Sequence, residues 1–211
     1  MKCIRQADHR DRDQINALRV NEFNRSNQFT LLKPDKLLWN SCDDESVVLS
    51  AWDGTRVVAT MRAVVVHNAP EASTCAQCTI PPDALFPAVI FNSAATDLEY
   101  RGLGLNQALR YHFLKMALDS DVQALLSPMY QGAPRIRFME ALGYRFSVPQ
   151  LSWQDKLNPK TTRIMGIMPQ ERMACAMQMI EMQRRDIIRT YPWHGETAKF
   201  QIRMLNVASH R

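Results

Sequence analysis

Apolar residues along the chain follow two different spacings, and each spacing predicts one type of element. Short runs rich in valine, isoleucine and leucine predict strands, because β-branched side chains pack well on a sheet. Apolar residues three or four positions apart predict helices with one buried face. The predicted strands cover 2–5, 47–52, 56–67, 87–96, 122–126 and 144–153, and the predicted helices cover 8–23, 34–39, 105–116, 135–142 and about 169–190. This order indicates a layered α/β fold with a mixed sheet.

Small polar residues, glycines and prolines mark the ends of these elements. Asp8 is the predicted N-cap of the first helix, and Asp53-Gly54 is a predicted hairpin turn. Gly143 ends the predicted helix 135–142. The segment 68–86 contains several prolines, so we expect a long surface loop there, placed to cover a site.

Composition places the chain among ordinary globular proteins. Its 211 residues are 46% hydrophobic and 22% charged, so we expect one domain over 1–211, with an additional C-terminal helix near 169–190. The net charge of +5 is spread over scattered Lys and Arg residues, which does not favour nucleic acid as a partner. A mild positive excess suits either an anionic cofactor or an acidic protein, and composition does not separate the two.

Targeting and metal-binding signals are weak. No apolar run approaches the ~20 residues of a membrane span, and residues 1–13 lack the apolar stretch of a secretory signal, so we expect a cytoplasmic protein. Five scattered cysteines do not form a disulfide framework. Cys75-Ala76-Gln77-Cys78 has the spacing of half a zinc site, but no second ligand pair follows, so we expect no metal.

The most informative unit is a predicted strand, a glycine-bearing turn and a helix. The turn is Arg101-Gly102-Leu103-Gly104-Leu105-Asn106, and Leu105, Leu109, Phe113 and Met116 form the apolar stripe of the helix. Free amide groups and the positive end of the helix dipole suit a phosphate, and Arg101 adds a full charge. On spacing alone, a phosphate site and a purely structural turn remain equally open.

Two segments carry a resemblance to a known family. Residues 99–109, Glu-Tyr-Arg-Gly-Leu-Gly-Leu-Asn-Gln-Ala-Leu, resemble the acyl-CoA-binding signature Q/R-x-x-G-x-G/A of the GNAT superfamily. Residues 137–144, Arg-Phe-Met-Glu-Ala-Leu-Gly-Tyr, resemble the family's helix ending in R-F-Y-E-x-L-G-F. The resemblance covers residues 2 to about 153 and implies a mixed, mostly antiparallel sheet flanked by helices, with a V-shaped opening between two parallel strands.

The same resemblance implies how an acyl donor binds. No cofactor is expected to be tightly bound. The donor's phosphopantetheine arm, on coenzyme A or on an acidic acyl carrier protein, is expected to lie in the opening and to pair with the backbone of 96–98. The residues implied in donor binding are Thr96, Leu98, Arg101, Gly102, Leu103, Gly104, Leu105 and Asn106.

Departures from the family pattern leave the catalytic groups open. Met139 stands where the family has a tyrosine general acid, and Asn106 replaces the last small residue of the signature. Tyr130 is a candidate replacement for the acid, and Asp97 and His67 are candidate bases. The alternatives are a packed tyrosine, a solvated carboxylate and a structural histidine.

A second resemblance is to autoinducer synthases and N-acyl amino acid synthases. Leu18-Arg19-Val20-Asn21-Glu22-Phe23 is similar to their R-x-x-x-F helix, and 54–62 loosely resembles their G-x-x-x-G-x-x-R strand. Arg62 and Arg19 are therefore candidates for binding an acceptor carboxylate, with a surface salt bridge as the alternative. Ile90 and Ser93 stand where autoinducer synthases have glutamate and arginine, which argues against that activity.

These observations lead to one expected function with two alternatives. We expect an N-acyltransferase that moves a long acyl chain from a phosphopantetheine thioester to the amine of a small molecule such as an amino acid. The alternatives are an acetyl-CoA-dependent acetyltransferase and a non-catalytic thioester-binding module. The remaining candidate substrate-binding residues are polar Asn92 and the apolar residues Phe91, Met129, Phe138 and Met139.

Overall fold

A computed structural model describes residues 1–25, 38–147, 163–196 and 199–202. Its centre is a seven-stranded sheet with the strand order β1-β2-β3-β4-β5-β7-β6. Every neighbouring pair is antiparallel except β4 and β5, which are parallel. The strands are β1 (Lys2–Gln6), β2 (Val47–Asp53), β3 (Arg56–Val66), β4 (Ala88–Thr96), β5 (Ala124–Tyr130), β6 (Arg145–Ser147) and β7 (Arg163–Pro169).

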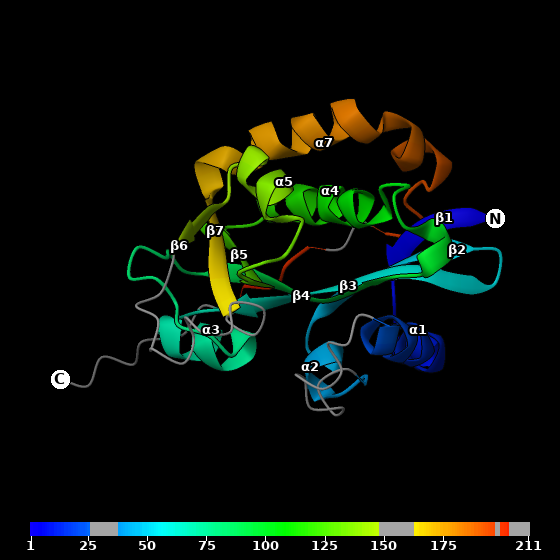
Figure 1. The fold of residues 1–211 in the computed structure, drawn as a ribbon, viewed down its shortest axis with the longest axis horizontal. Coiled ribbons are helices and arrows are strands. Elements are labelled where there is room, and N and C mark those ends of the chain that lie inside the picture. Colours follow the sequence, from blue (N-terminus) through cyan, green and yellow to red (C-terminus); the bar gives the residue numbers. More distant parts are fainter. Residues whose placement is uncertain (26–37, 148–162, 197–198, 203–211) are drawn as a thin grey trace.

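Helices cover both faces of the sheet (Figure 1). One face carries α4 (Leu105–Leu118), α5 (Ile136–Ala141) and α7 (Gln170–Thr190), and the other carries α1 (Arg12–Arg25), α2 (Ser41–Asp44) and α3 (Ala69–Ala76). Two 3-10 turns, η1 (His9–Asp11) and η4 (Leu98–Tyr100), precede α1 and α4. This arrangement confirms the predicted mixed, mostly antiparallel sheet flanked by helices.

The largest apolar cluster lies between the sheet and the helices α4 and α7. The predicted stripe of α4 is confirmed, because Leu105, Leu109, Phe113 and Met116 are all at most 2% exposed. Burying one such side chain stabilises a fold by about 1.5–3 kcal/mol. The stripe therefore fixes α4, and with it the glycine turn at its start, against the sheet.

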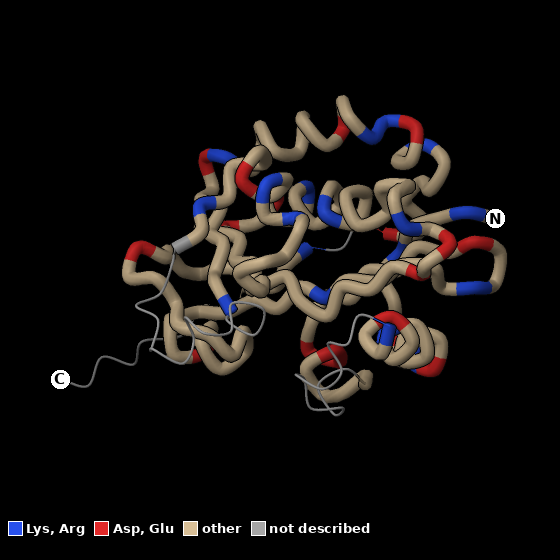
Figure 2. Tube along the Cα trace, viewed as in Figure 1, with Lys and Arg blue, Asp and Glu red and all other residues tan. Residues whose placement is uncertain are grey.

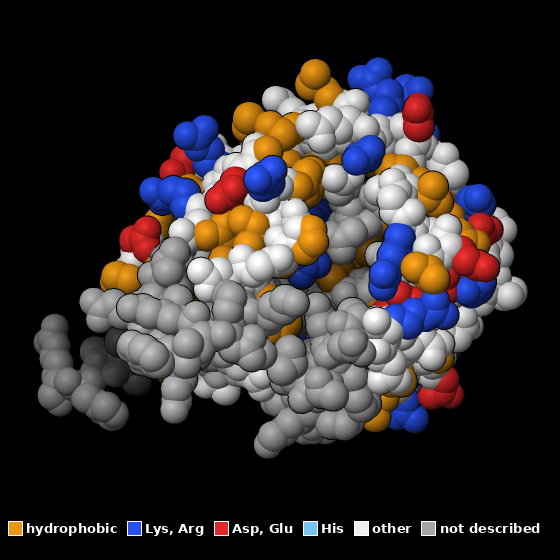
Figure 3. All heavy atoms as spheres, viewed as in Figure 1, with side chains coloured by type: hydrophobic (Ala, Val, Ile, Leu, Met, Phe, Trp, Pro, Cys, Tyr) orange, Lys and Arg blue, Asp and Glu red, His pale blue; other side chains and the backbone are white. Residues whose placement is uncertain are grey.

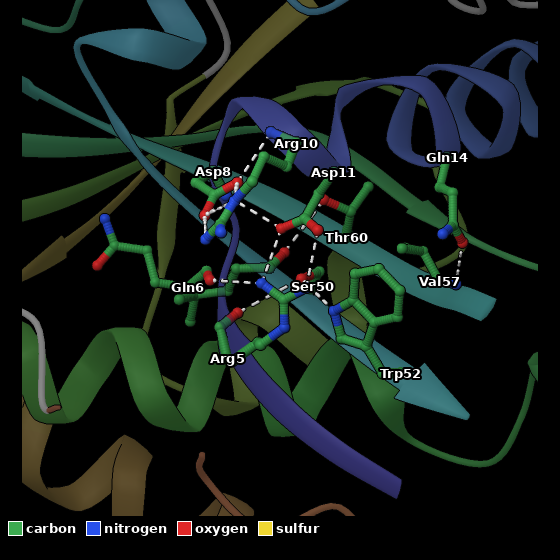
Figure 4. Close-up of polar contacts among 11 residues, drawn as sticks. Arg5, Gln6, Asp8, Arg10, Asp11, Gln14, Ser50, Trp52, Val57 and Thr60 are labelled. Atoms are coloured by element: carbon green, nitrogen blue, oxygen red, sulfur yellow. Dashed lines mark hydrogen bonds and ion pairs between the residues drawn. The ribbon is translucent and has the colours of Figure 1, made fainter. Parts of the chain in front are cut away.

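A polar cluster at the N-terminus attaches α1 to the opposite face (Figure 4). Arg5 of β1 donates two hydrogen bonds to the carboxylate of Asp11, each over 2.7 Å, and its guanidinium stacks on Trp52 at 4.4 Å. Asp8 caps η1 in a reciprocal capping box with Asp11, as the sequence predicts. These contacts hold the start of the helical segment whose later residues reach the site.

The parallel strands β4 and β5 pair only over their first residues. Their register runs from Ala88 with Ala124 to Ile90 with Leu126 and stops there, although both strands continue. Beyond this point β4 carries one extra residue relative to β3, because Thr60 opposes Ala95 whereas Arg62 opposes Asn92. Such a bulge bends the strand away from its neighbour. The two strands therefore diverge, which confirms the predicted V-shaped opening.

Several elements differ from the sequence prediction. The segment 68–86 is not only a loop, because α3 begins after Asn68, whose side chain accepts a hydrogen bond from the Glu71 amide over 2.9 Å. Pro70 fits the first turn of that helix, where no amide donor is needed. Strand β7 was not predicted. The predicted elements 34–39 and 144–153 lie partly outside the described residues; 38–39 are not helical, and β6 covers part of the second.

Charged residues of both signs alternate along the described chain on both faces of the sheet (Figure 2). None of the helices in the described ranges combines the length and the apolar character that a membrane span needs.

Candidate active site

A cleft of about 920 Å³ opens where β4 and β5 diverge. Its walls come from the second half of β4, the end of β5, the glycine turn, the first turns of α4, and residues around α5. Figure 3 shows a hollow on this face of the molecule, with Lys or Arg side chains at its edge. A cleft of this size lies in the range of small-molecule and cofactor sites.

The glycine turn places the start of α4 at the cleft. Gly102 and Gly104 have φ angles of 80° and 96°, in the left-handed region that glycine adopts at little cost. Gly104 is the N-cap of α4, and glycine has no side chain to accept a hydrogen bond from the first amides of the helix. Because Gly104 and the first residues of α4 line the cleft, the amides and the dipole at this helix start can bind an anion there.

The lining of the cleft is strongly cationic. Glu22 is the one acidic residue among the described residues that line it, and Glu22 forms an ion pair with Arg101. The cleft therefore has a net positive potential that attracts anionic ligands. The lining arginines are Arg62, Arg101, Arg110, Arg135, Arg163 and Arg184.

Arg110 is a buried cation that sequence reasoning missed. It is 3% exposed, its Nε donates to Asn106 Oδ1 over 3.2 Å, and its guanidinium lies 5.4 Å from the centre of the Phe91 ring. Burial lowers the pKa of Arg110, and Tyr144 opposes that shift. Its Nη1 has no hydrogen-bond partner among the described residues. The one sequence signal is an arginine beside the apolar stripe of α4, four residues after Asn106.

On the face of α1 and α2, two arginines share one carboxylate. Arg62 Nη1 donates to Asp43 Oδ2 over 3.0 Å, and Arg19 Nη2 donates to Asp43 Oδ1 over 2.7 Å. Arg62 also donates from Nε to Asn92 Oδ1 over 2.8 Å. The alternative of a salt bridge holds for both arginines, but the ion pairs are buried and not at the surface, because all three charged side chains are at most 8% exposed. Arg62 and Asn92 line the cleft, whereas Arg19 lies behind Asp43.

Cys75 lies beside Asn92 on the same side of the cleft. Asn92 Nδ2 lies 3.6 Å from Cys75 Sγ, and Cys75 lines the cleft. Burial raises the pKa of the Cys75 thiol to about 11. The thiol is therefore protonated at neutral pH and is a poor nucleophile.

Apolar side chains line another part of the cleft. Phe91, Met129 and Met139 are buried and Phe138 is half-buried, and all four line the cleft as the sequence analysis grouped them. The Phe91 ring stacks on Phe113 of α4 with a centroid distance of 5.1 Å. This packing holds one side of an apolar wall at the point where the strands separate.

The three candidate catalytic residues lie in different places. Tyr130 lines the cleft at the end of β5, and its buried hydroxyl has no hydrogen-bond partner among the described residues. Asp97 does not line the cleft; it accepts from Arg56 Nη2 over 2.5 Å and from the Glu99 amide over 3.1 Å. His67 follows Val66, which pairs with the first residue of β4, so it lies away from the glycine turn. Only Tyr130 is thus brought into the cleft.

The predicted donor-binding residues divide in a similar way. Leu98 and Leu103 do not line the cleft, and each is 50% exposed. No group of three or more His, Cys, Asp or Glu side chains arranged to hold a metal occurs within the described ranges. The predicted residues that line the cleft are Thr96, Arg101, Gly102, Gly104, Leu105 and Asn106.

Comparison with solved structures identifies acyltransferases of similar fold. The structure of BjaI, a CoA-dependent acyl-homoserine lactone synthase with SAM and isopentyl-CoA, matches with a TM-score of 0.57 at 19% identity, over 85% of this chain and 90% of that chain. FeeM, an N-acyl amino acid synthase from uncultured soil microbes, matches with a TM-score of 0.57 at 10% identity, over 86% of this chain and 98% of that chain. The ribosomal-protein-S18-alanine N-acetyltransferase from Escherichia coli matches with a TM-score of 0.52 at 14% identity, over 80% and 94% respectively.

No protein-family model and no curated protein sequence matches this chain. At the identities of the structural matches, the likeness is one of fold. The chain therefore has the fold of the GNAT acyltransferases.

Proposed function

We propose that the protein transfers a long acyl chain from a phosphopantetheine thioester to the amine of a small molecule that carries a carboxylate, such as an amino acid. The observation that carries this proposal is the uncapped start of α4, which opens onto the cleft between β4 and β5. A phosphate suits the start of a helix, and an extended pantetheine arm suits the side of a strand that has separated from its neighbour.

The donor is held at two points. Its phosphates bind the amides after Gly104 and the guanidinium of Arg101, which exchanges Glu22 for the phosphate. Its pantetheine arm runs along β4 and pairs with the backbone at 96–98, so the exposed side chain of Leu98 takes no part. BjaI, of similar fold, is described as CoA-dependent, which supports a thioester of this class.

The acceptor carboxylate binds Arg62. The Arg62 guanidinium pairs with the buried carboxylate of Asp43, which also pairs with Arg19. Of the two arginines, only Arg62 lines the cleft. Arginine holds a carboxylate through paired hydrogen bonds, so Arg62 suits an anionic acceptor group.

The reaction forms a C–N bond and breaks a C–S bond. The neutral amine attacks the thioester carbonyl and loses its proton to water. The oxyanion is stabilised by backbone amide donors at the β4 bulge around Ser93, whose φ angle is 49°. The departing thiolate takes a proton from the Tyr130 hydroxyl, which has no other partner among the described residues, and the tyrosinate regains a proton from water.

The apolar wall favours a long acyl chain. Each methylene that binds against Phe91, Met129, Phe138 and Met139 gains about 0.8 kcal/mol. An N-acyl amino acid synthase, FeeM, shares the fold, which supports the pairing of such a donor with an amino acid.

A substrate panel tests the proposal. Purified protein is incubated with acetyl-, hexanoyl-, dodecanoyl- and palmitoyl-CoA, each with a mixture of amino acids, and the products are identified by mass spectrometry. We expect N-acyl amino acids, with the highest kcat/KM for the long chains. Turnover of acetyl-CoA alone would assign an acetyltransferase instead. Thioester binding without any product across the panel, and with an acylated carrier protein as donor, would assign a non-catalytic binding module.

A further inference from the structure

The C-terminal helix α7 is fixed at both ends against the rest of the fold. Its first half buries Met173, Ala176 and Ile180 in the main apolar cluster. After its end, the Ile4 amide donates to the Pro192 carbonyl over 2.9 Å, and the His194 amide donates to the Ile4 carbonyl over 2.8 Å. The middle of α7 therefore has a defined position over α4, on the face of the sheet opposite α1 (Figure 1).

One residue interrupts this helix. Arg184 has φ −131° and ψ 23°, although α7 contains no proline or glycine that would cause a kink. The interruption coincides with a tertiary contact, because the Arg184 side chain reaches the glycine turn at the start of α4. A Cβ atom added to Gly104 would lie 2.9 Å from Arg184 Cδ. The kink therefore places a guanidinium against the turn.

The Arg184 guanidinium has more N–H donors than its contact with α4 uses. Its Nε donates to Gln107 Oε1 in the first turn of α4, and no acidic side chain forms an ion pair with it among the described residues. Arg184 also lines the cleft. The bond to Gln107 is enough to connect α7 to α4. The two terminal nitrogens of Arg184 provide four more N–H donors that this connection does not need.

Arg184 and Arg101 approach the turn from opposite faces of the sheet. Arg101 extends toward Glu22 of α1, and Arg184 comes from α7. The amide groups after Gly104 belong to the helix start that Arg184 contacts, and Arg101 lies three residues before Gly104. A pyrophosphate has two adjacent negative phosphates, whereas a phosphodiester has a single negative charge. The pyrophosphate is therefore the better match for a helix start with two guanidinium groups.

We propose that Arg184 is a donor-binding residue that contacts the pyrophosphate of coenzyme A, so that the donor is an acyl-CoA and not an acylated carrier protein. This inference rests on the proposed function, because it assigns the donor for the same cleft. The pantetheine arm of a carrier protein is attached through one phosphodiester and lacks the second phosphate that Arg184 contacts. The C-terminal helix thereby acquires a role in donor selection.

Isothermal titration of the full chain tests the assignment. The titrants are coenzyme A and pantetheine, which lacks phosphate, and the variants are Arg184→Gln, Arg184→Lys and Arg185→Gln. Arg185 is the matched control, since it is the adjacent arginine, is exposed and does not line the cleft. We expect Arg184→Gln to weaken coenzyme A binding about tenfold or more, Arg184→Lys to weaken it less, and pantetheine binding to stay unchanged in all variants.

Three results would overturn the assignment. If Arg184→Gln lowers the melting temperature but binds coenzyme A as tightly as the wild type, Arg184 is only a clip between α7 and α4. If Arg185→Gln weakens binding as much as Arg184→Gln, the effect is one of net charge. In both cases the proposed function stands. If the wild type binds neither coenzyme A nor pantetheine, the proposed function fails together with this inference.

Discussion

Arg62 donates a hydrogen bond to Asp43 over 3.0 Å, and both side chains are buried. Because Asp43 also accepts from Arg19 over 2.7 Å, one carboxylate serves two cations at the wall of the cleft. The arrangement has two consequences that can be separated, one for stability and one for substrate choice.

The stability consequence concerns Asp43. The substitution Asp43→Asn removes a buried carboxylate that pairs with both Arg62 and Arg19, so we expect a loss of about 3–5 kcal/mol in the free energy of unfolding. Urea denaturation followed by circular dichroism measures it. Glu45→Gln is the control, because Glu45 is exposed beside the same helix, and it should cost less than about 0.5 kcal/mol. Equal effects of the two variants would contradict a buried charge pair.

The substrate consequence concerns Arg62. The wild type should prefer an amino acid over the corresponding amino acid amide by about tenfold or more in kcat/KM, because only the acid offers a carboxylate to the guanidinium. In Arg62→Gln this preference should disappear while the KM for acyl-CoA stays the same. A preference that persists in the variant places the acceptor carboxylate elsewhere.

The proposed role of the Tyr130 hydroxyl as proton donor leads to a prediction for kcat. Tyr130→Phe should lower kcat about 100-fold without raising either KM, because the thiolate loses its proton donor. It should not lower stability, since the hydroxyl has no hydrogen-bond partner among the described residues. Tyr191→Phe is a matched control, because the buried Tyr191 hydroxyl also has no hydrogen-bond partner within the described ranges, and Tyr191 does not line the cleft. An unchanged kcat in Tyr130→Phe would remove Tyr130 from the reaction.

Glycine is needed at position 104 for two reasons, which are the positive φ angle and the close contact with Arg184. Gly104→Ala should weaken coenzyme A binding about tenfold, because a Cβ at a φ angle of 96° is strained and would lie 2.9 Å from Arg184 Cδ. Gly195→Ala is the control, with a φ angle of 105° and no atom of the described residues within 4 Å of an added Cβ. Calorimetry should show binding unchanged in that control. Unchanged binding in Gly104→Ala would mean that neither the turn nor Arg184 touches the donor.

The buried His112 makes the free energy of unfolding depend on pH. Burial, with Lys115 adding to it, lowers the pKa of His112 from 6.5 to about 4. Between these values the unfolded chain binds a proton that the folded chain does not bind, so stability falls as the pH decreases from 6.5 toward 4. At about 1.4 kcal/mol per pKa unit, the loss is of the order of 3 kcal/mol.

The variant His112→Phe isolates this contribution. A phenyl ring suits the site, because the His112 ring packs 5.1 Å from that of Trp193. Unfolding free energies measured across this pH range should fall less steeply in the variant than in the wild type. Parallel curves would show that other groups produce the acid sensitivity.

Local patterns in the sequence predicted the elements that build the cleft. The stripe of α4, the turn at Gly102 and Gly104, and the apolar strand that becomes β4 each follow from residues close together in the chain. Gly166 shows where such patterns fail. It lies in the middle of β7, where an added Cβ would meet the Phe146 ring at 2.6 Å, so this glycine serves close strand packing that only the fold reveals.

The charged part of the site depends on contacts distant in sequence. Arg184 reaches Gly104 from 80 residues further along the chain (184 minus 104), and Asp43 meets Arg62 from a neighbouring element. Neither arginine differs in its local pattern from a surface arginine. A helical pattern around 170–190 predicted that α7 exists, but its kink at Arg184 has no proline or glycine signal.

The most direct test of the account is a crystal structure of the protein with coenzyme A. We expect density for the pyrophosphate at the amides after Gly104, between the guanidinium groups of Arg101 and Arg184, and for the pantetheine arm between β4 and β5. Coenzyme A bound at another surface, or a glycine turn closed by protein side chains with the cleft empty, would contradict it.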